Sequence, residues 1–199
     1  MLKEYKFCPL CTEPLESKVV GSAERRQCTG KACEFVFWNN PTPVLAAITH
    51  RNDEVILIQA IGWPKHWFSL VTGFHEAGET AEEGVLREVK EELGLNGTVQ
   101  SLVGVYSFFE MNQVIIAYDV LVDDDDISLD TNELVDYKII KTQELKTWPS
   151  GTGQAAKDWL ASQGIVNEEL SFRKKSAPHF KGLINTFTSN LGLEAIFYS

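Results

Sequence analysis

A glycine-punctuated loop that turns directly into an amphipathic helix most constrains the fold of this 199-residue chain. Thr80 followed by Glu83 forms the pattern of a capping box, so the sequence predicts a helix that begins near Ala81. Gly94 is typical of the residue at which such a helix stops. At 100° per residue, the apolar residues of this helix share one arc that must face a core: Ala81, Val85, Leu86, Val89 and Leu93.

Three glutamates of the same helix, Glu88, Glu91 and Glu92, are spaced i, i+3 and i+4 and therefore project as one cluster. Glu92 falls inside the apolar arc, so we expect the cluster to lie at the edge of the core. Crowded carboxylates repel one another and lose hydration, which is costly unless a cation supplies positive charge. Oxygen ligands alone favour Mg²⁺ or Mn²⁺ over zinc. A solvated acidic helix face is the alternative, and spacing alone would favour it.

The stretch from Gly73 to Leu95 resembles the Nudix box, the signature of the Nudix hydrolases. The chain matches the box at every defined position: Gly73, Glu79, Arg87, Glu88, Val89, Glu91, Glu92, Gly94 and Leu95. The resemblance implies an α+β fold, the Nudix-type α/β/α sandwich with a mixed sheet. It also implies an enzyme that hydrolyses a diphosphate linked to another group, usually in a nucleoside diphosphate derivative.

The resemblance also implies a role for each matched residue. Glu88, Glu91 and Glu92 would bind Mg²⁺ or Mn²⁺, and the carbonyl of Gly73 would be a backbone ligand. The bound cation would attract a diphosphate that glutamates alone repel, and it would lower the pKa of a coordinated water. Glu88 or Glu91 is the expected general base.

Two further residues of the box would act on its shape. Glu79 paired with Arg87 would hold the loop against the helix.

All four cysteines stand within the first 40 residues, in two short pairs, Cys8 with Cys11 and Cys28 with Cys33. Two such pairs separated by a linker predict a small zinc ribbon, because each pair turns two thiolates toward one tetrahedral Zn²⁺. The sequence has no fifth cysteine and no nearby histidine, so the zinc would be structural rather than catalytic. Two disulfides are the alternative, and a reducing cytosol disfavours them.

A turn-rich linker, residues 39–43, predicts the boundary between a ribbon of residues 1–40 and a Nudix domain of residues 41–164. In that domain we expect a hairpin of strands 44–49 and 55–59, and a short strand at 67–71. Strands at 98–109, 113–122 and 137–140 and a second helix at 154–162 complete the expected elements. We expect residues 165–199 to be a C-terminal extension with an amphipathic helix, because one helical face is apolar: Phe180, Leu183, Ile184, Phe187 and Leu191.

The order of these parts resembles the zinc-ribbon branch of the family, which includes NADH pyrophosphatases. In that branch a further glutamate beyond the box joins the metal site, and Glu133 is the matching candidate, with Glu110 as the alternative. The chain lacks the Ser-Gln-Pro-Trp-Pro-Phe-Pro run of the NADH pyrophosphatases, because residues 105–113 have another sequence. NADH, FAD and ADP-ribose therefore all stay open as substrates.

A net charge of −10 argues against non-specific binding to nucleic acid or to an anionic membrane surface. No apolar run approaches the ~20 residues of a transmembrane helix, and the N-terminus lacks a signal-peptide core, so we expect a cytoplasmic protein. The expected partner is a small-molecule nucleotide, and the family resemblance together with the apolar C-terminal face suggests a homodimer. Two other functions stay open: a nucleotide-sensing regulator that does not cleave its ligand, and removal of a nucleotide cap from RNA.

Overall fold

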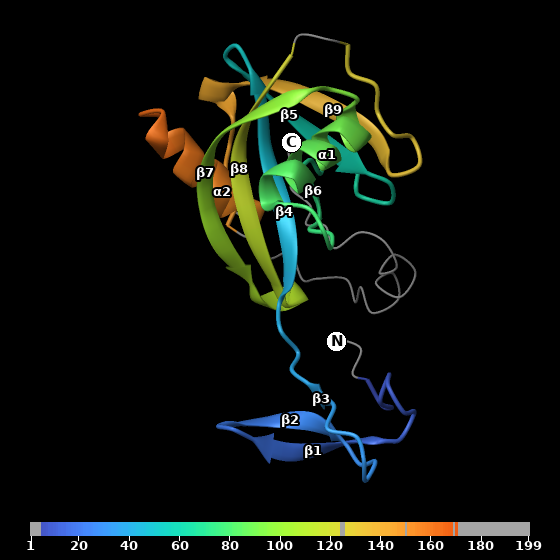
Figure 1. Ribbon diagram of the computed structural model, residues 1–199. Coiled ribbons are helices and arrows are strands. Elements are labelled where there is room, and N and C mark those ends of the chain that lie inside the picture. Colours follow the sequence, from blue (N-terminus) through green and yellow to red (C-terminus); the bar gives the residue numbers. More distant parts are fainter. Residues whose placement is uncertain (1–4, 124–125, 150, 169, 171–199) are drawn as a thin grey trace. The chain divides into compact units, whose positions relative to one another are not determined.

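The computed structural model describes residues 5–123, 126–149, 151–168 and 170 (Figure 1). Two compact units divide the chain, one ending at Pro41 and the other beginning at Thr42. The first unit is an antiparallel three-stranded sheet of β1 (Leu15–Val20), β2 (Ala23–Cys28) and β3 (Val36–Phe37). We call it the ribbon unit.

The second unit is built on a six-stranded sheet whose central strand is β4 (Thr42–Arg51). Along one edge β4 runs parallel to β8, and along its other edge it pairs antiparallel with two strands in turn, first β6 and then β5. The order across the sheet is β7-β8-β4-β5-β9, so the sheet is mixed. The other strands are β5 (Glu54–Ala60), β6 (Val71–Phe74), β7 (Gly97–Phe108), β8 (Gln113–Val122) and β9 (Leu134–Lys141).

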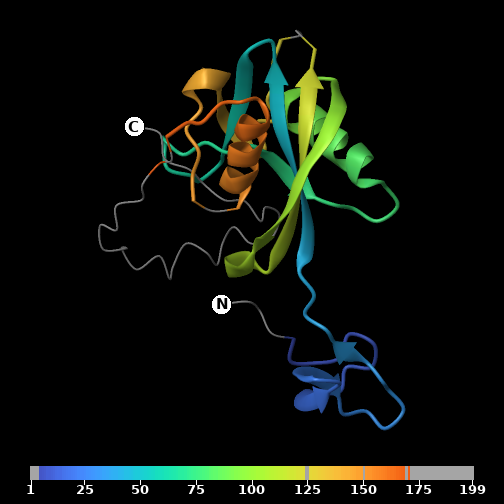
Figure 2. The same cartoon turned by 90° about the vertical axis from the view of Figure 1, so that its left-hand side faces the viewer.

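One helix covers each face of this sheet, as the edge-on view shows (Figure 2). Helix α1 (Ala81–Leu93) packs on one face through a cluster that includes Leu45, Ile56 and Val89. Helix α2 (Thr152–Ser162) packs on the other through Trp159 and Leu160. Alternation of side chains along the strands separates the two clusters, since neighbouring residues of a strand point to opposite faces. The unit is the α/β/α sandwich that the sequence predicted.

Helix α1 begins and ends where its sequence signals predicted. The Thr80 hydroxyl accepts a bond from the Glu83 amide at 3.2 Å, and the Glu83 carboxylate accepts one from the Thr80 amide at 2.8 Å. Gly94 ends the helix in the left-handed region at φ 72°, with its amide donating to the Lys90 carbonyl. These caps satisfy orphan backbone groups, so the orientation of every box residue on the helix is fixed from both ends.

The expected hairpin is confirmed, because β5 follows β4 in antiparallel register. The two strands expected at 98–109 and 113–122 are also confirmed, as the antiparallel pair β7 and β8. The strand expected at 67–71 is wrong in position. A turn, closed by a bond from the Trp67 amide to the Pro64 carbonyl, precedes it, and Ser69 makes only an isolated bridge to Ile58. The strand itself is β6, which pairs with β4 and includes Gly73.

The amphipathic helix expected in the C-terminal extension, with Phe180 and Leu191 on its apolar face, lies outside the described residues. Neither helix of the described residues is both long and apolar enough to span a lipid bilayer.

Candidate active site

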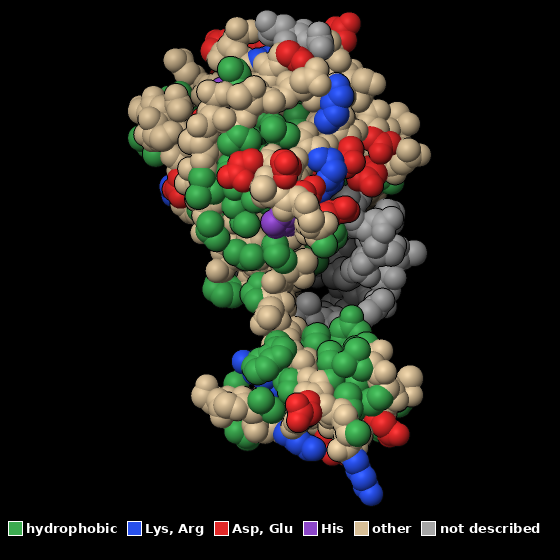
Figure 3. Space-filling model, viewed as in Figure 1, with side chains coloured by type: hydrophobic (Ala, Val, Ile, Leu, Met, Phe, Trp, Pro, Cys, Tyr) green, Lys and Arg blue, Asp and Glu red, His purple; other side chains and the backbone are tan. Residues whose placement is uncertain are grey.

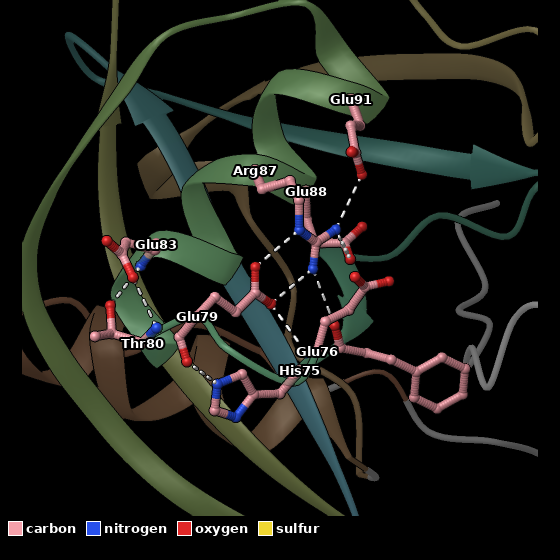
Figure 4. A network of polar contacts seen from close by, with 9 residues as sticks. His75, Glu76, Glu79, Thr80, Glu83, Arg87, Glu88 and Glu91 are labelled. Atoms are coloured by element: carbon pink, nitrogen blue, oxygen red, sulfur yellow. Dashed lines mark hydrogen bonds and ion pairs between the residues drawn. The ribbon is translucent and has the colours of Figure 1, made fainter.

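Acidic side chains gather around basic ones over helix α1 on the face shown in Figure 3. At their centre is the Arg87 guanidinium, which Figure 4 shows between the loop and the helix. Its Nε and Nη2 atoms donate to the two carboxylate oxygens of Glu79 at 3.0 and 2.9 Å, and Nη2 also donates to the Phe74 carbonyl at 3.1 Å. The two bonds from Arg87 to Glu79, with one from the Glu76 amide, lower the pKa of Glu79 to about 2. The loop is thereby fastened to the helix.

The remaining side of the guanidinium faces two more carboxylates. Its Nη1 atom donates to Glu88 at 2.7 Å and to Glu91 at 3.0 Å. The Glu88 side chain is only 12% exposed, whereas that of Glu91 is 58% exposed. The single positive charge of Arg87 therefore pairs with three carboxylates, and the net charge of the cluster stays negative.

Gly73 shapes the space that the Glu88 carboxylate occupies. A Cβ atom at position 73 would lie 1.9 Å from the Glu88 carboxyl carbon and 2.0 and 2.2 Å from its oxygens. Only glycine leaves room for the carboxylate there. Burial raises the pKa of Glu88, and the charges of Glu91 and Glu133 add to the rise, against the opposing effect of Arg87.

Glu92 is the most unusual carboxylate of the cluster. It is 2% exposed, and neither of its carboxylate oxygens has a hydrogen-bond partner among the described residues. Burial raises its pKa well above the ordinary value, and the charges of Glu88 and Glu133 raise it further. A buried, unpartnered carboxylate is strongly unfavourable in a protein interior, so this position demands either a proton or a cation.

Two acids of the segment before β9 belong to the same neighbourhood. The pKa of Glu133 is raised by burial and then by the charges of Asp130 and Glu91. Asp130 also acts on Glu92, and its amide donates to the Glu92 carbonyl at 3.2 Å. Asp130 was not among the predicted site residues, since no periodicity or motif marks it. Glu110 lies elsewhere, on the short 3₁₀ helix Phe109–Met111 between β7 and β8.

Comparison with known proteins agrees with this geometry. The family model described as the NUDIX domain matches residues 40–162 of the chain. The chain belongs to the Nudix family.

Named Nudix relatives align with parts of the chain. An ADP-ribose pyrophosphatase of Methanocaldococcus jannaschii is 45% identical over 75 residues, which cover 37% of this chain and 44% of that protein. The NAD-capped RNA hydrolase NudC of Pseudomonas putida is 23% identical over 149 residues, covering 75% of this chain and 52% of that protein. The chain thus spans about half the length of these curated relatives.

Solved structures show the same Nudix fold. A NUDIX hydrolase from Nitrosomonas europaea superposes with a TM-score of 0.67 at 22% identity, covering 83% of this chain and 97% of that one. An ADP-ribose pyrophosphatase from Streptococcus suis gives a TM-score of 0.52 at 18% identity, covering 65% of this chain and 97% of that one.

Nudix hydrolases use divalent metals, and the residues of this Nudix box fit one. The Glu92 oxygens, which have no hydrogen-bond partner in the part of the chain that the structure describes, and the Glu88 carboxylate beside Gly73 are all oxygen donors. Such donors suit hard cations such as Mg²⁺ and Mn²⁺.

The ribbon unit offers a different donor set. The four cysteines are reduced, and their sulfur atoms all lie within 4.8 Å of one another: Cys8, Cys11, Cys28 and Cys33. The Cys11 and Cys28 sulfurs are 3.3 Å apart, and those of Cys8 and Cys33 are 3.7 Å apart. Four converging thiols match a closed tetrahedral zinc site.

Proposed function

We propose that the chain is a divalent-metal-dependent hydrolase of the pyrophosphate bond in a nucleoside diphosphate derivative such as NADH, FAD or ADP-ribose. The observation that carries the proposal is the buried Glu92 carboxylate, which has no hydrogen-bond partner among the described residues. It lies in the same acidic cluster as the Glu88 carboxylate, which occupies the space that Gly73 leaves open. In a family of metal-dependent hydrolases, a bound cation is the simplest compensation for this buried charge.

Glu88, Glu91 and Glu92 would hold Mg²⁺ or Mn²⁺, with the Gly73 carbonyl and Glu133 as further ligands. When bound, the metal neutralises phosphate charge and makes a water more acidic. Glu88 or Glu91 accepts the proton of the water that attacks phosphorus, and the P–O–P bridge breaks to give two monophosphates. Arg87 fixes the direction of both carboxylates through its bonds at 2.7 and 3.0 Å, so that little reorganisation accompanies the reaction.

The names of the Nudix relatives support a substrate with two groups joined by a pyrophosphate. They include an ADP-ribose pyrophosphatase, NAD-capped RNA hydrolases and a mouse NAD(P)H pyrophosphatase. The NudC of Pseudomonas putida, which aligns over three quarters of this chain, favours one second candidate: removal of an NAD cap from RNA. Both candidates use the same metal site and cleave the same bond.

A substrate panel tests the proposal. The purified chain is incubated with NADH, NAD, FAD, ADP-ribose, coenzyme A, diadenosine polyphosphates and NAD-capped RNA, with Mg²⁺ or Mn²⁺, and products are resolved by chromatography. We expect monophosphate products that disappear with EDTA and in E92Q but persist in E144Q, which removes an equal charge at an exposed glutamate. Tight binding of one compound without products from any of them would instead favour a sensor.

A further inference from the structure

The ribbon unit contains a pocket of about 390 Å³ that no part of the hydrolase site uses. Aromatic and basic side chains of β2, β3 and the residue after β3 line it, with one acid: Glu24, Arg25, Arg26, Phe37 and Trp38. None of these residues is a cysteine of the thiol cluster. The pocket therefore needs its own explanation.

Trp38 and Arg25 form a fixed pair in this pocket. The Arg25 guanidinium lies 4.7 Å from the centre of the Trp38 ring, and its Nη1 atom donates to the Trp38 carbonyl at 2.7 Å. Stacking and hydrogen bonding together hold the cation in place before any ligand arrives. Trp38 is nevertheless 50% exposed, so the pair leaves much of the indole open to a second flat partner.

The other side chains of the pocket are also held in place. Arg26 donates from Nη2 to the Leu15 carbonyl at 2.8 Å, and Tyr5 packs edge-on against Phe37 with ring centres 5.0 Å apart. The Glu24 carboxylate accepts a bond from the Ser17 hydroxyl at 2.7 Å. Rigid aromatic and cationic groups beside a single oriented carboxylate are well suited to a ligand that is both flat and anionic.

Charge is distributed unevenly between the two units. Residues 1–41 contain six lysines and arginines and five glutamates, a net charge of +1, whereas the whole chain carries −10. The remaining residues therefore carry −11. Because the overall charge is set by residues outside the ribbon unit, it does not exclude binding of an anion there.

We propose that this pocket binds one unpaired nucleotide. The base stacks on Trp38, the phosphate pairs with the Arg25 guanidinium, and Glu24 accepts a hydrogen bond from an exocyclic amino group of the base. The nucleotide comes either from single-stranded RNA or from a free mononucleotide, which share this chemistry. Uracil has no exocyclic amino group, so the site discriminates against it.

Fluorescence anisotropy of the full chain with labelled oligoadenylate and oligouridylate tests the proposal. We expect W38A to weaken oligoadenylate binding about 5- to 150-fold, the effect of one lost base stack. We expect R25Q to reduce the slope of the logarithm of affinity against the logarithm of salt concentration by about one, which corresponds to one released counterion. F7A and K31Q are the matched controls, since they remove an exposed aromatic ring and an exposed charge of the same ribbon unit outside the pocket.

The outcomes distinguish an RNA strand from a free mononucleotide as the ligand, and they distinguish failure of the nucleotide site from failure of the proposed hydrolase function. Displacement of oligoadenylate by AMP would identify a free-nucleotide site, and resistance to AMP would identify the RNA strand as the occupant. Wild-type affinity in W38A, equal binding of oligouridylate, or no binding of oligoadenylate, oligouridylate or AMP would overturn the nucleotide site. Hydrolysis of free dinucleotides, measured on the same preparations, should be unchanged in every variant, so a failure of the hydrolase proposal is recognised separately.

Discussion

Replacing Glu92 by Gln should stabilise the metal-free protein and remove its stabilisation by metal. The side chain keeps its size but loses a charge that is 2% exposed and without a hydrogen-bond partner among the described residues. Burial raises the pKa of Glu92 well above the ordinary value, so the folded state holds this proton to a higher pH than the unfolded chain does. As pH rises above the unfolded pKa of about 4.3, wild type therefore loses stability relative to E92Q, by up to about 1.4 kcal/mol per pH unit. The loss ends once pH exceeds the folded pKa.

Divalent metal should make wild type more stable than E92Q, the reverse of their relative stability without metal. A ligand that binds only the folded state at 100 times its dissociation constant adds about 2.7 kcal/mol to the free energy of unfolding. Wild type should gain this amount of stability from Mg²⁺ or Mn²⁺, and the stability of E92Q should change little.

Urea unfolding at a series of pH values, with EDTA or with Mn²⁺, measures both effects. E144Q is the control, because it removes a charge at an exposed glutamate and should follow wild type throughout. A pH-independent difference between wild type and E92Q in EDTA, or equal stabilisation of both by Mn²⁺, would refute the reasoning.

Three further perturbations follow from the same geometry. G73A places a Cβ 1.9 Å from the Glu88 carboxyl carbon, so it should lower the free energy of unfolding by about 1–3 kcal/mol and reduce turnover. Urea unfolding and rate assays measure the two effects, and a wild-type rate would contradict the role of Gly73 in making room for Glu88. R87K keeps the charge but loses the two-point contact with Glu79 and should lower metal affinity or turnover about 10- to 100-fold, measured by metal titration of rates. C8S should bring zinc, measured by mass spectrometry, below one ion per chain; unchanged zinc would remove Cys8 from the site.

Local signals were sufficient to predict most of the fold. The capping box at Thr80 and the left-handed Gly94 bound helix α1 as expected, because both act through neighbouring backbone atoms. The strand before the box was misplaced by several residues. Its pairing with β4 is a long-range contact, and apolar residues from Trp67 to Val71 gave no local reason to begin the strand later.

In the site, too, residues placed by local helical spacing could be predicted, whereas a residue placed by a long-range contact could not. Helical spacing predicted that Glu92 would lie within the buried arc, and the structure confirms its burial. Asp130 comes close only because the chain returns to pack beside the end of α1, where its amide meets the Glu92 carbonyl. The pocket of the ribbon unit could not be predicted from the sequence either, since the stacking of Arg25 on Trp38 joins residues that are separated along the chain.

Calorimetric titration of Mn²⁺ into the metal-free protein tests the central claim most directly, when repeated in buffers of different ionisation enthalpy. Wild type should bind Mn²⁺ and release a proton at pH values where the buried Glu92 is protonated, whereas E92Q should bind weakly and release less. Identical isotherms and identical proton release for wild type and E92Q would contradict the claim that this buried carboxylate exists to hold a metal ion.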